Sequence, residues 1–348
     1  MKKMSKSIFR MLSEPIFEAI EDHDLTPDQS TEVIETLLGK GQESLIYALK
    51  QNSPEMLERN RQNTSAFEER NYERWREPLD LLTMLWVCCE ELAENHAHEG
   101  PYDGDTLVFD SLAHLQPRAL LVANEIICLL KGGFADGALT RWRSLHEIVV
   151  TAMFIAKHGH DAALGYRLSM WFANARAAKQ YNGHASRAEL MPFDAQELDE
   201  IESMRAKAEK QLGKVLKNDW DWSADILGKK KPNFSDVERD VGMDHWRPRF
   251  RWACQHIHAG FMRPDKLLGM SEAERFAFQV GPSNSGLVDP IHMTAISLMQ
   301  ITTGFLFFPQ PNADRVIFAR VLQALADEIG NIALLTQERT MNNAREGA

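Results

Sequence analysis

Two short segments of this chain combine arginine with histidine at the same spacing. Residues 141–146 read RWRSLH and residues 251–256 read RWACQH, so each begins with Arg-Trp and ends with a histidine. Histidine can move protons near neutral pH and arginine can hold a phosphate, a combination that suits cleavage of a phosphodiester bond. The pattern therefore indicates four candidate catalytic residues, Arg141, His146, Arg251 and His256.

Helical geometry sets a condition on such a site. Residues five apart on an α-helix point about 140° apart around its axis, so Arg141 and His146 do not share a face. A working site needs the two motif helices to pack together and to contribute an arginine and a histidine each. Arg143 and Glu147 are four residues apart and do share a face.

The same residues also have a structural interpretation. Arg143 and Glu147 stand inside an apolar helical pattern, and buried charges need partners. Glu125 and Arg167 occur in neighbouring apolar segments and are the expected partners in a buried ion-pair network. The spacing alone leaves the catalytic and the structural interpretation open.

Charge is unevenly distributed along the 348 residues, whose formal net charge is −11. Residues 1–100 hold 11 lysines and arginines against 20 carboxylates, whereas residues 245–263 hold four arginines, three histidines and no acid. Basic residues interleaved with aromatic ones are typical of surfaces that bind single-stranded nucleic acid, although large aromatic side chains more often anchor a loop to the core. The candidate nucleic-acid-binding residues are Lys229, Lys230, Lys231, Arg247, Arg249 and Trp252.

Hydrophobic periodicity of about 3.6 residues runs through most of the chain, and strand signals are almost absent. The sequence predicts an all-α fold: a multi-helix bundle over residues 105–340 that carries the Arg/His/Glu residues, preceded by an acidic helical arm over residues 1–100. The turn GPYDG at 100–104 is the expected boundary, and Asp136 is the expected cap of the first motif helix. An exposed acidic arm suits contact with a protein partner or with a second copy of the chain.

Several classes of function lack sequence support. No run of about 18 apolar residues is present, which predicts no membrane span. The four cysteines form no CxxC pair and are expected to be buried, reduced thiols of a cytoplasmic protein. Spacing typical of metal ligands, glycine-rich nucleotide loops and a GxSxG elbow are missing, so no metal and no cofactor is expected.

One family resemblance rests on the stretch EIICLLKGGFADGALTRWRSLHEI at 125–148, together with GYR at 165–167 and QHIHAG at 255–260. These segments resemble domain-of-unknown-function family 5677, a family of uncharacterised bacterial helical proteins, over roughly residues 107–335. The resemblance implies that five residues form one polar cluster: Glu125, Arg143, Glu147, Arg167 and His258.

The paired arginine–histidine elements also look like the signature of the HEPN superfamily of helical ribonucleases. That resemblance implies a metal-independent endoribonuclease in a bacterial toxin or phage-defence system. Trp142 and Trp252 stand where that superfamily usually has a polar residue after the arginine. The alternative is a non-catalytic helical module that binds a protein partner or nucleic acid.

Overall fold

The computed structural model describes Thr31, Glu35 and residues 42–100, 104–273 and 277–346, and all regular secondary structure in these residues is helical. The predicted all-α fold is therefore confirmed. A further helix that the sequence predicts near residues 8–22 lies outside the described residues. The α-helices are α3 Gln42–Asn52, α4 Pro54–Glu99, α5 Thr106–Lys131, α6 Ala135–His158, α7 His160–His184, α8 Ala195–Leu212, α9 Ala224–Leu227, α10 Phe234–Asp240, α11 Arg247–Gln255, α12 Val288–Leu306 and α13 Ala313–Glu346.

The chain divides into two compact units, Met1–Arg70 and Asn71–Ala348, and α4 crosses the division. The sequence placed the boundary later, at residues 100–104. The difference arises because Trp75, Leu79 and the following leucines of α4 are fully buried and belong to the core of the second unit. Trp75 has non-helical angles (φ −104°, ψ 15°), close to Pro78, which cannot donate to the carbonyl one turn earlier.

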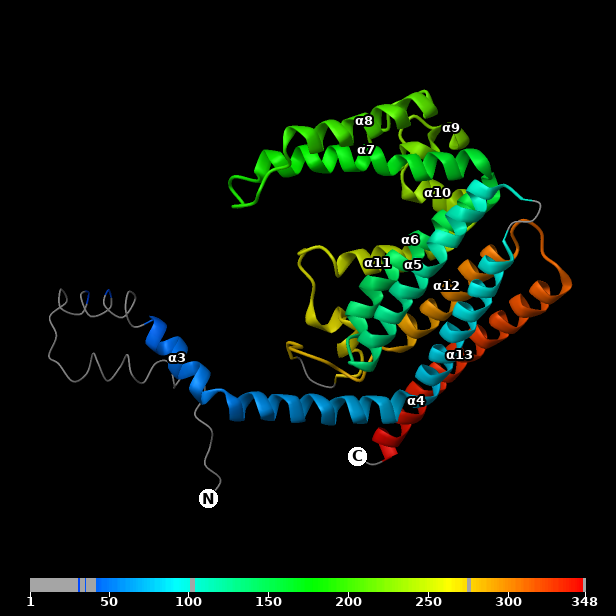
Figure 1. Ribbon diagram of the computed structural model, residues 1–348. Helices are drawn as coiled ribbons and strands as arrows, with labels where there is room; N and C mark the ends of the chain where they lie inside the picture. Colours follow the sequence, from blue (N-terminus) through cyan, green and yellow to red (C-terminus); the bar gives the residue numbers. More distant parts are fainter. Residues whose placement is uncertain (1–30, 32–34, 36–41, 101–103, 274–276, 347–348) are drawn as a thin grey trace, which may run out of the picture. The chain divides into compact units, whose positions relative to one another are not determined.

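Helices α5 and α6 pack against each other in the middle of the second unit (Figure 1). Asp105 caps α5 because its side chain accepts hydrogen bonds from the backbone N–H groups of Leu107 (2.9 Å) and Val108 (3.2 Å). Gly133 has a φ of 77°, which glycine adopts readily, and the chain reverses there into α6. Both helices also contact α12, which packs against α13.

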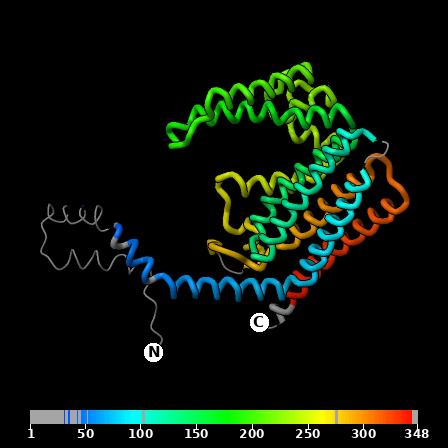
Figure 2. Tube along the Cα trace, in the orientation of Figure 1, coloured from blue at the N-terminus to red at the C-terminus, as the bar shows by residue number. Residues whose placement is uncertain are grey.

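Helices α7 and α8 form a hairpin on one side of α5 and α6, and α8 begins with a capping box made by Asp194 and Glu197 (Figure 1). Gly165 allows α7 to approach the backbone of Trp222, since a Cβ atom there would lie 3.0 Å from the Trp222 carbonyl oxygen. The short helices α10 and α11 contact α6. Between α11 and α12 the described chain contains only two short 3₁₀ turns, Pro264–Lys266 and Leu268–Met270 (Figure 2).

The four cysteines are free thiols, but their exposure differs from the prediction. Cys89 is buried, whereas Cys128 is exposed because it stands one helical turn after Asn124 on the exposed face of α5. A helix with the length and apolar character required to span a bilayer does not occur in the described part of the chain.

Candidate functional site: a sealed histidine and an open basic pocket

The first motif histidine lies in the interior. His146 on α6 is 1% exposed, and its Nε2 lies 2.8 Å from Oε1 of Glu238 on α10, which is fully buried. A carboxylate oxygen can only accept, so Nε2–H of His146 donates to it. The second carboxylate oxygen of Glu238 forms an ion pair with Arg247 at the start of α11. Three helices therefore meet at a histidine–glutamate–arginine cluster in which His146 and Glu238 are buried and Arg247 is 20% exposed.

Aromatic rings close the remaining sides of this cluster. The His146 ring stacks on Trp142 with a centroid distance of 5.0 Å. Phe234 packs against it in a T-shaped contact and Phe250 in a tilted one, with centroid distances of 5.9 and 5.8 Å. The Arg247 guanidinium lies over the same two phenylalanine rings, 5.1 and 5.0 Å from their centroids. Such cation–π contacts favour a desolvated arginine. The aromatic shell excludes a polymer substrate from His146 in this conformation.

Trp142 shows why the residue after the motif arginine is not polar here. Its ring is buried, and its Nε1–H donates to the carbonyl oxygen of Met293 (3.1 Å) and to Oγ of Ser297 (3.0 Å). It therefore joins α6 to α12 and also supports the His146 ring. This tryptophan is part of the packing between helices.

Burial lowers the pKa of His146 below its ordinary value, and the charges of Arg247 and His245 act in the same direction. The hydrogen bond and the negative charge of Glu238 raise that pKa and partly compensate. The net effect is a neutral imidazole at neutral pH. Its chemistry is that of a fixed hydrogen-bond donor.

Sequence reasoning did not identify Glu238 and Phe250 as neighbours of His146. A signal for Glu238 is present. Phe234, Val237, Glu238 and Val241 follow the i, i+3, i+4, i+7 spacing of one helical face, which places the acid on the buried side of α10.

Arg143 and Glu147 share a face of α6, as their four-residue spacing predicts, and Nη2 of Arg143 lies 2.8 Å from Oε1 of Glu147. Nε–H of Arg143 also points at Sγ of Cys254, 3.2 Å away on α11. Burial raises the pKa of Glu147, while the positive charges of Arg143, Arg247 and Arg118 lower it. This half-buried pair joins α6 to α11.

The other three residues of the polar cluster that the family resemblance implies, Glu125, Arg167 and His258, do not join Arg143 and Glu147. Glu125 forms an ion pair with Arg141 across α5 and α6, and Arg167 on α7 lies 3.7 Å from Asp110 on α5. His258 is exposed and lines a different pocket. The expectation that Glu125 or Arg167 would form an ion pair with Arg143 or Glu147 was wrong, because Glu125 pairs with Arg141 and Arg167 lies near Asp110.

The second motif histidine, His256, follows α11, and its side chain is 5% exposed beside the first turn of α6. Nδ1 of His256 lies 3.3 Å from Oδ1 of Asp136, in the first turn of α6. Asp136 does not cap α6, because its carboxylate accepts hydrogen bonds from the backbone N–H groups of Leu268 (2.8 Å) and Gly269 (3.1 Å). Ten residues of α-helix separate Asp136 from His146, a rise of about 15 Å. The two motif helices pack together, but their histidines are not pooled in one site.

The candidate nucleic-acid-binding residues fall into two groups. Lys229 pairs with Asp236 at 2.5 Å, Arg247 with Glu238, and Arg249 lies 3.6 Å from Asp289 and over the Trp246 ring. Trp252 is half-buried against the core. Lys230, Lys231 and the motif arginine Arg251 are exposed, and so are Lys229 and Arg249 despite their acidic partners.

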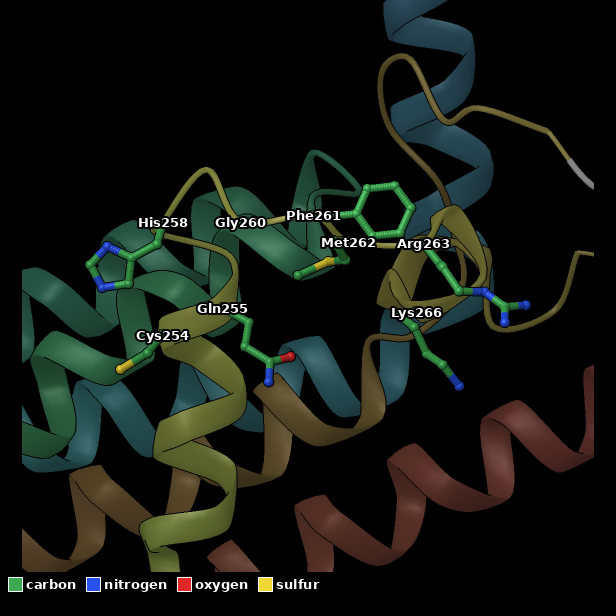
Figure 3. Close-up of a pocket in the computed structure, with 8 residues that line it drawn as sticks. All are labelled: Cys254, Gln255, His258, Gly260, Phe261, Met262, Arg263 and Lys266. Atoms are coloured by element: carbon green, nitrogen blue, oxygen red, sulfur yellow. The ribbon is translucent and has the colours of Figure 1, made fainter.

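An open pocket of about 520 Å³ begins where α11 ends (Figure 3). Its wall contains three side chains with basic nitrogen groups, His258, Arg263 and Lys266, and no carboxylate. Phe261 also lines it and is 97% exposed. Arg263 forms a two-pronged contact with Asp265 at 2.9 and 3.1 Å, and both Lys266 and His258 are exposed.

Residues 110–275 match the model of DUF5677, described as a family of unknown function. The resemblance expected from the RSLHE core and its flanking segments is thereby confirmed. The matched region includes α6, α10, α11 and the open pocket. No curated protein and no solved structure matches this chain. Within the described residues, no three histidine, cysteine, aspartate or glutamate side chains gather as ligands for a metal ion.

Proposed function

We propose that this chain is a helical module that binds single-stranded nucleic acid, with RNA as its ligand, in the open pocket after α11. The observation that carries the proposal is the pocket wall: His258, Arg263 and Lys266 without a lining carboxylate, beside a Phe261 ring that is 97% exposed. This basic pocket wall contrasts with the net charge of the whole chain, which is −11. Basic side chains contact phosphates and exposed rings stack with unpaired bases.

The neighbouring face of α11 extends the same chemistry. Arg251 and Gln255 stand four residues apart on the exposed side of α11, and Gln255 lines the pocket. A strand that stacks on Phe261 can therefore place its next phosphates along α11 toward Arg251. The motif arginine would then hold a phosphate, as the sequence suggested.

The test is binding of a fluorescently labelled oligouridine to the full chain, followed by anisotropy at several salt concentrations. Phe261→Ala should weaken binding about 5-fold or more, because stacking on an aromatic side chain contributes roughly 1–3 kcal/mol per base. Lys266→Gln should also reduce the salt dependence, by about 0.7 in the slope for each lost phosphate contact. Lys207→Gln, an exposed lysine of α8, is the charge-matched control and should bind like wild type. Equal affinity in all four proteins would overturn the proposal.

RNA cleavage stays a separate prediction, and the same incubations test it in the presence of EDTA. Both motif histidines are buried in the described conformation, which is why binding is the function that this geometry supports best. Intact RNA on a denaturing gel supports a binding module. Fragments produced by wild type, but not by a folded His146→Ala/His256→Ala variant, would replace it with the metal-independent ribonuclease. A toxin or phage-defence role and a partner for the N-terminal arm likewise stay predictions.

A further inference from the structure

A second pocket lies between α5 and α7, away from both motif histidines. Its volume is about 690 Å³, within the range of small-molecule sites, which is roughly 300–1,000 Å³. The side chains that define its chemistry are Asp110, His114 and Arg118 from α5 and Tyr166, Arg167 and Met170 from α7. Neither motif of the sequence analysis contributes to it.

Two arginines face this pocket from different helices. Arg118 stands on α5 and Arg167 on α7, and the pocket has one lining carboxylate, Asp110. Asp110 is 62% exposed and lies 3.7 Å from Arg167, so this ion pair is long and solvated. A dianionic group that enters the pocket can replace Asp110 as the partner of Arg167. Arginine also presents a planar fork of N–H groups that matches phosphate oxygens.

Tyr166 adds a neutral donor and a ring to the same wall. Its hydroxyl group interacts with the Arg118 side chain, and burial raises its pKa, so the hydroxyl keeps its proton at neutral pH. The ring is held by an edge-on contact with Trp222, 5.8 Å between centroids. Gly165, beside it, lets α7 pack on the Trp222 backbone. The phenol is therefore positioned before any ligand arrives.

We propose that the pocket between α5 and α7 binds a small phosphomonoester of nucleotide size. Arg118 and Arg167 hold its phosphate, the Tyr166 hydroxyl donates to a phosphate oxygen, and the Tyr166 ring and Met170 contact the nucleoside. The volume of about 690 Å³ leaves room beyond the phosphate, and Ala113, Met170 and the Tyr166 ring offer apolar surface to the rest of the ligand. This site is separate from the open pocket after α11.

The experiment is isothermal titration calorimetry on the full chain with AMP, adenosine and inorganic phosphate as probes. AMP should bind at least tenfold more tightly than adenosine, and inorganic phosphate should compete with it weakly. Arg167→Gln should weaken AMP binding roughly tenfold or more, the loss expected when a charge-assisted hydrogen bond to phosphate is removed. Arg176→Gln is the matched control on the same helix, since its side chain pairs with Asp219 outside the pocket.

Arg118→Gln should weaken AMP binding as much as Arg167→Gln does. Because Arg118 also acts on Glu147, a circular dichroism melt checks its fold, and Arg167→Gln decides the question if Arg118→Gln is unfolded. The proposal is overturned if wild type binds neither AMP nor phosphate, if adenosine binds as well as AMP, or if Arg167→Gln binds AMP like wild type. Oligouridine binding by Arg167→Gln should equal that of wild type, which keeps the two pockets experimentally distinct.

Discussion

The segment that contains α11 places basic and aromatic side chains on two sides, one packed against α6 and one open to solvent. Toward α6, Arg247 and the phenylalanines close around His146 and Glu238 and exclude water. Toward solvent, Lys266, His258 and Phe261 line a pocket with no carboxylate in its wall. An arginine beside aromatic rings is therefore not a binding surface in itself. What distinguishes the two sides is whether a buried carboxylate already neutralises the cation.

Removing Glu238 should disrupt the buried cluster around His146 and should have the largest effect on stability of the substitutions considered. Glu238→Ala leaves Arg247 partly buried without its partner, and breaking such a pair costs about 3–5 kcal/mol in the free energy of unfolding. Urea denaturation followed by circular dichroism measures the change. Glu202→Ala, at an exposed pair on α8, should cost less than about 1 kcal/mol. Similar losses in the two variants would show that the buried cluster contributes no more to the free energy of unfolding than an exposed ion pair does.

Asp136 connects the two sides, because its carboxylate holds the chain just after the open pocket. Asp136→Ala removes the acceptor of the Leu268 and Gly269 N–H groups and should cost about 2 kcal/mol, in the range for unsatisfied buried donors. Oligouridine affinity should fall in the same variant, since the pocket loop loses its anchor. Asp136→Asn keeps one acceptor oxygen and should show about half of each effect. A stability loss with unchanged affinity would show that the pocket does not depend on this anchor.

The sealed side also predicts how stability depends on pH. The folded-state pKa of His146 lies below its ordinary value, so the unfolded chain binds a proton more readily. The stability contributed by the neutral imidazole is then complete above about pH 6.5 and is lost as the pH falls toward the folded pKa. Melting temperatures from pH 7.5 to 5.5 should fall less in His146→Gln than in wild type.

His96 and His292 have pKa values lowered by burial too, so part of the pH dependence remains in His146→Gln. His98→Gln is the control, because His98 is exposed and pairs only with Glu94 in the described residues. It should keep the full wild-type dependence. An identical pH profile for His146→Gln and wild type would remove His146 as a titrating group.

The sequence was sufficient for the fold class and for part of the site. Helical periodicity predicted the all-α fold, and the four-residue spacing of Arg143 and Glu147 predicted that they share a helix face, because both depend on local geometry. The partners of His146 and His256 lie about 90 and 120 residues away in the sequence, and no local pattern encodes such a contact. The open pocket was missed for a related reason: it depends on how an irregular loop folds back, and only its composition was visible.

Substitution of the motif arginine Arg141 should have the smallest effect on stability, in contrast to substitution of Arg247. Arg141 and its partner Glu125 are 39% and 43% exposed, so solvent screens their attraction. Arg141→Gln should lower the free energy of unfolding by at most about 1 kcal/mol and leave oligouridine binding unchanged. Arg247→Gln, in the buried pair with Glu238, should cost several times more. If Arg141→Gln instead abolished RNA binding or cleavage in a stable protein, the functional surface would lie on α5 and α6, and the open pocket would not be the site.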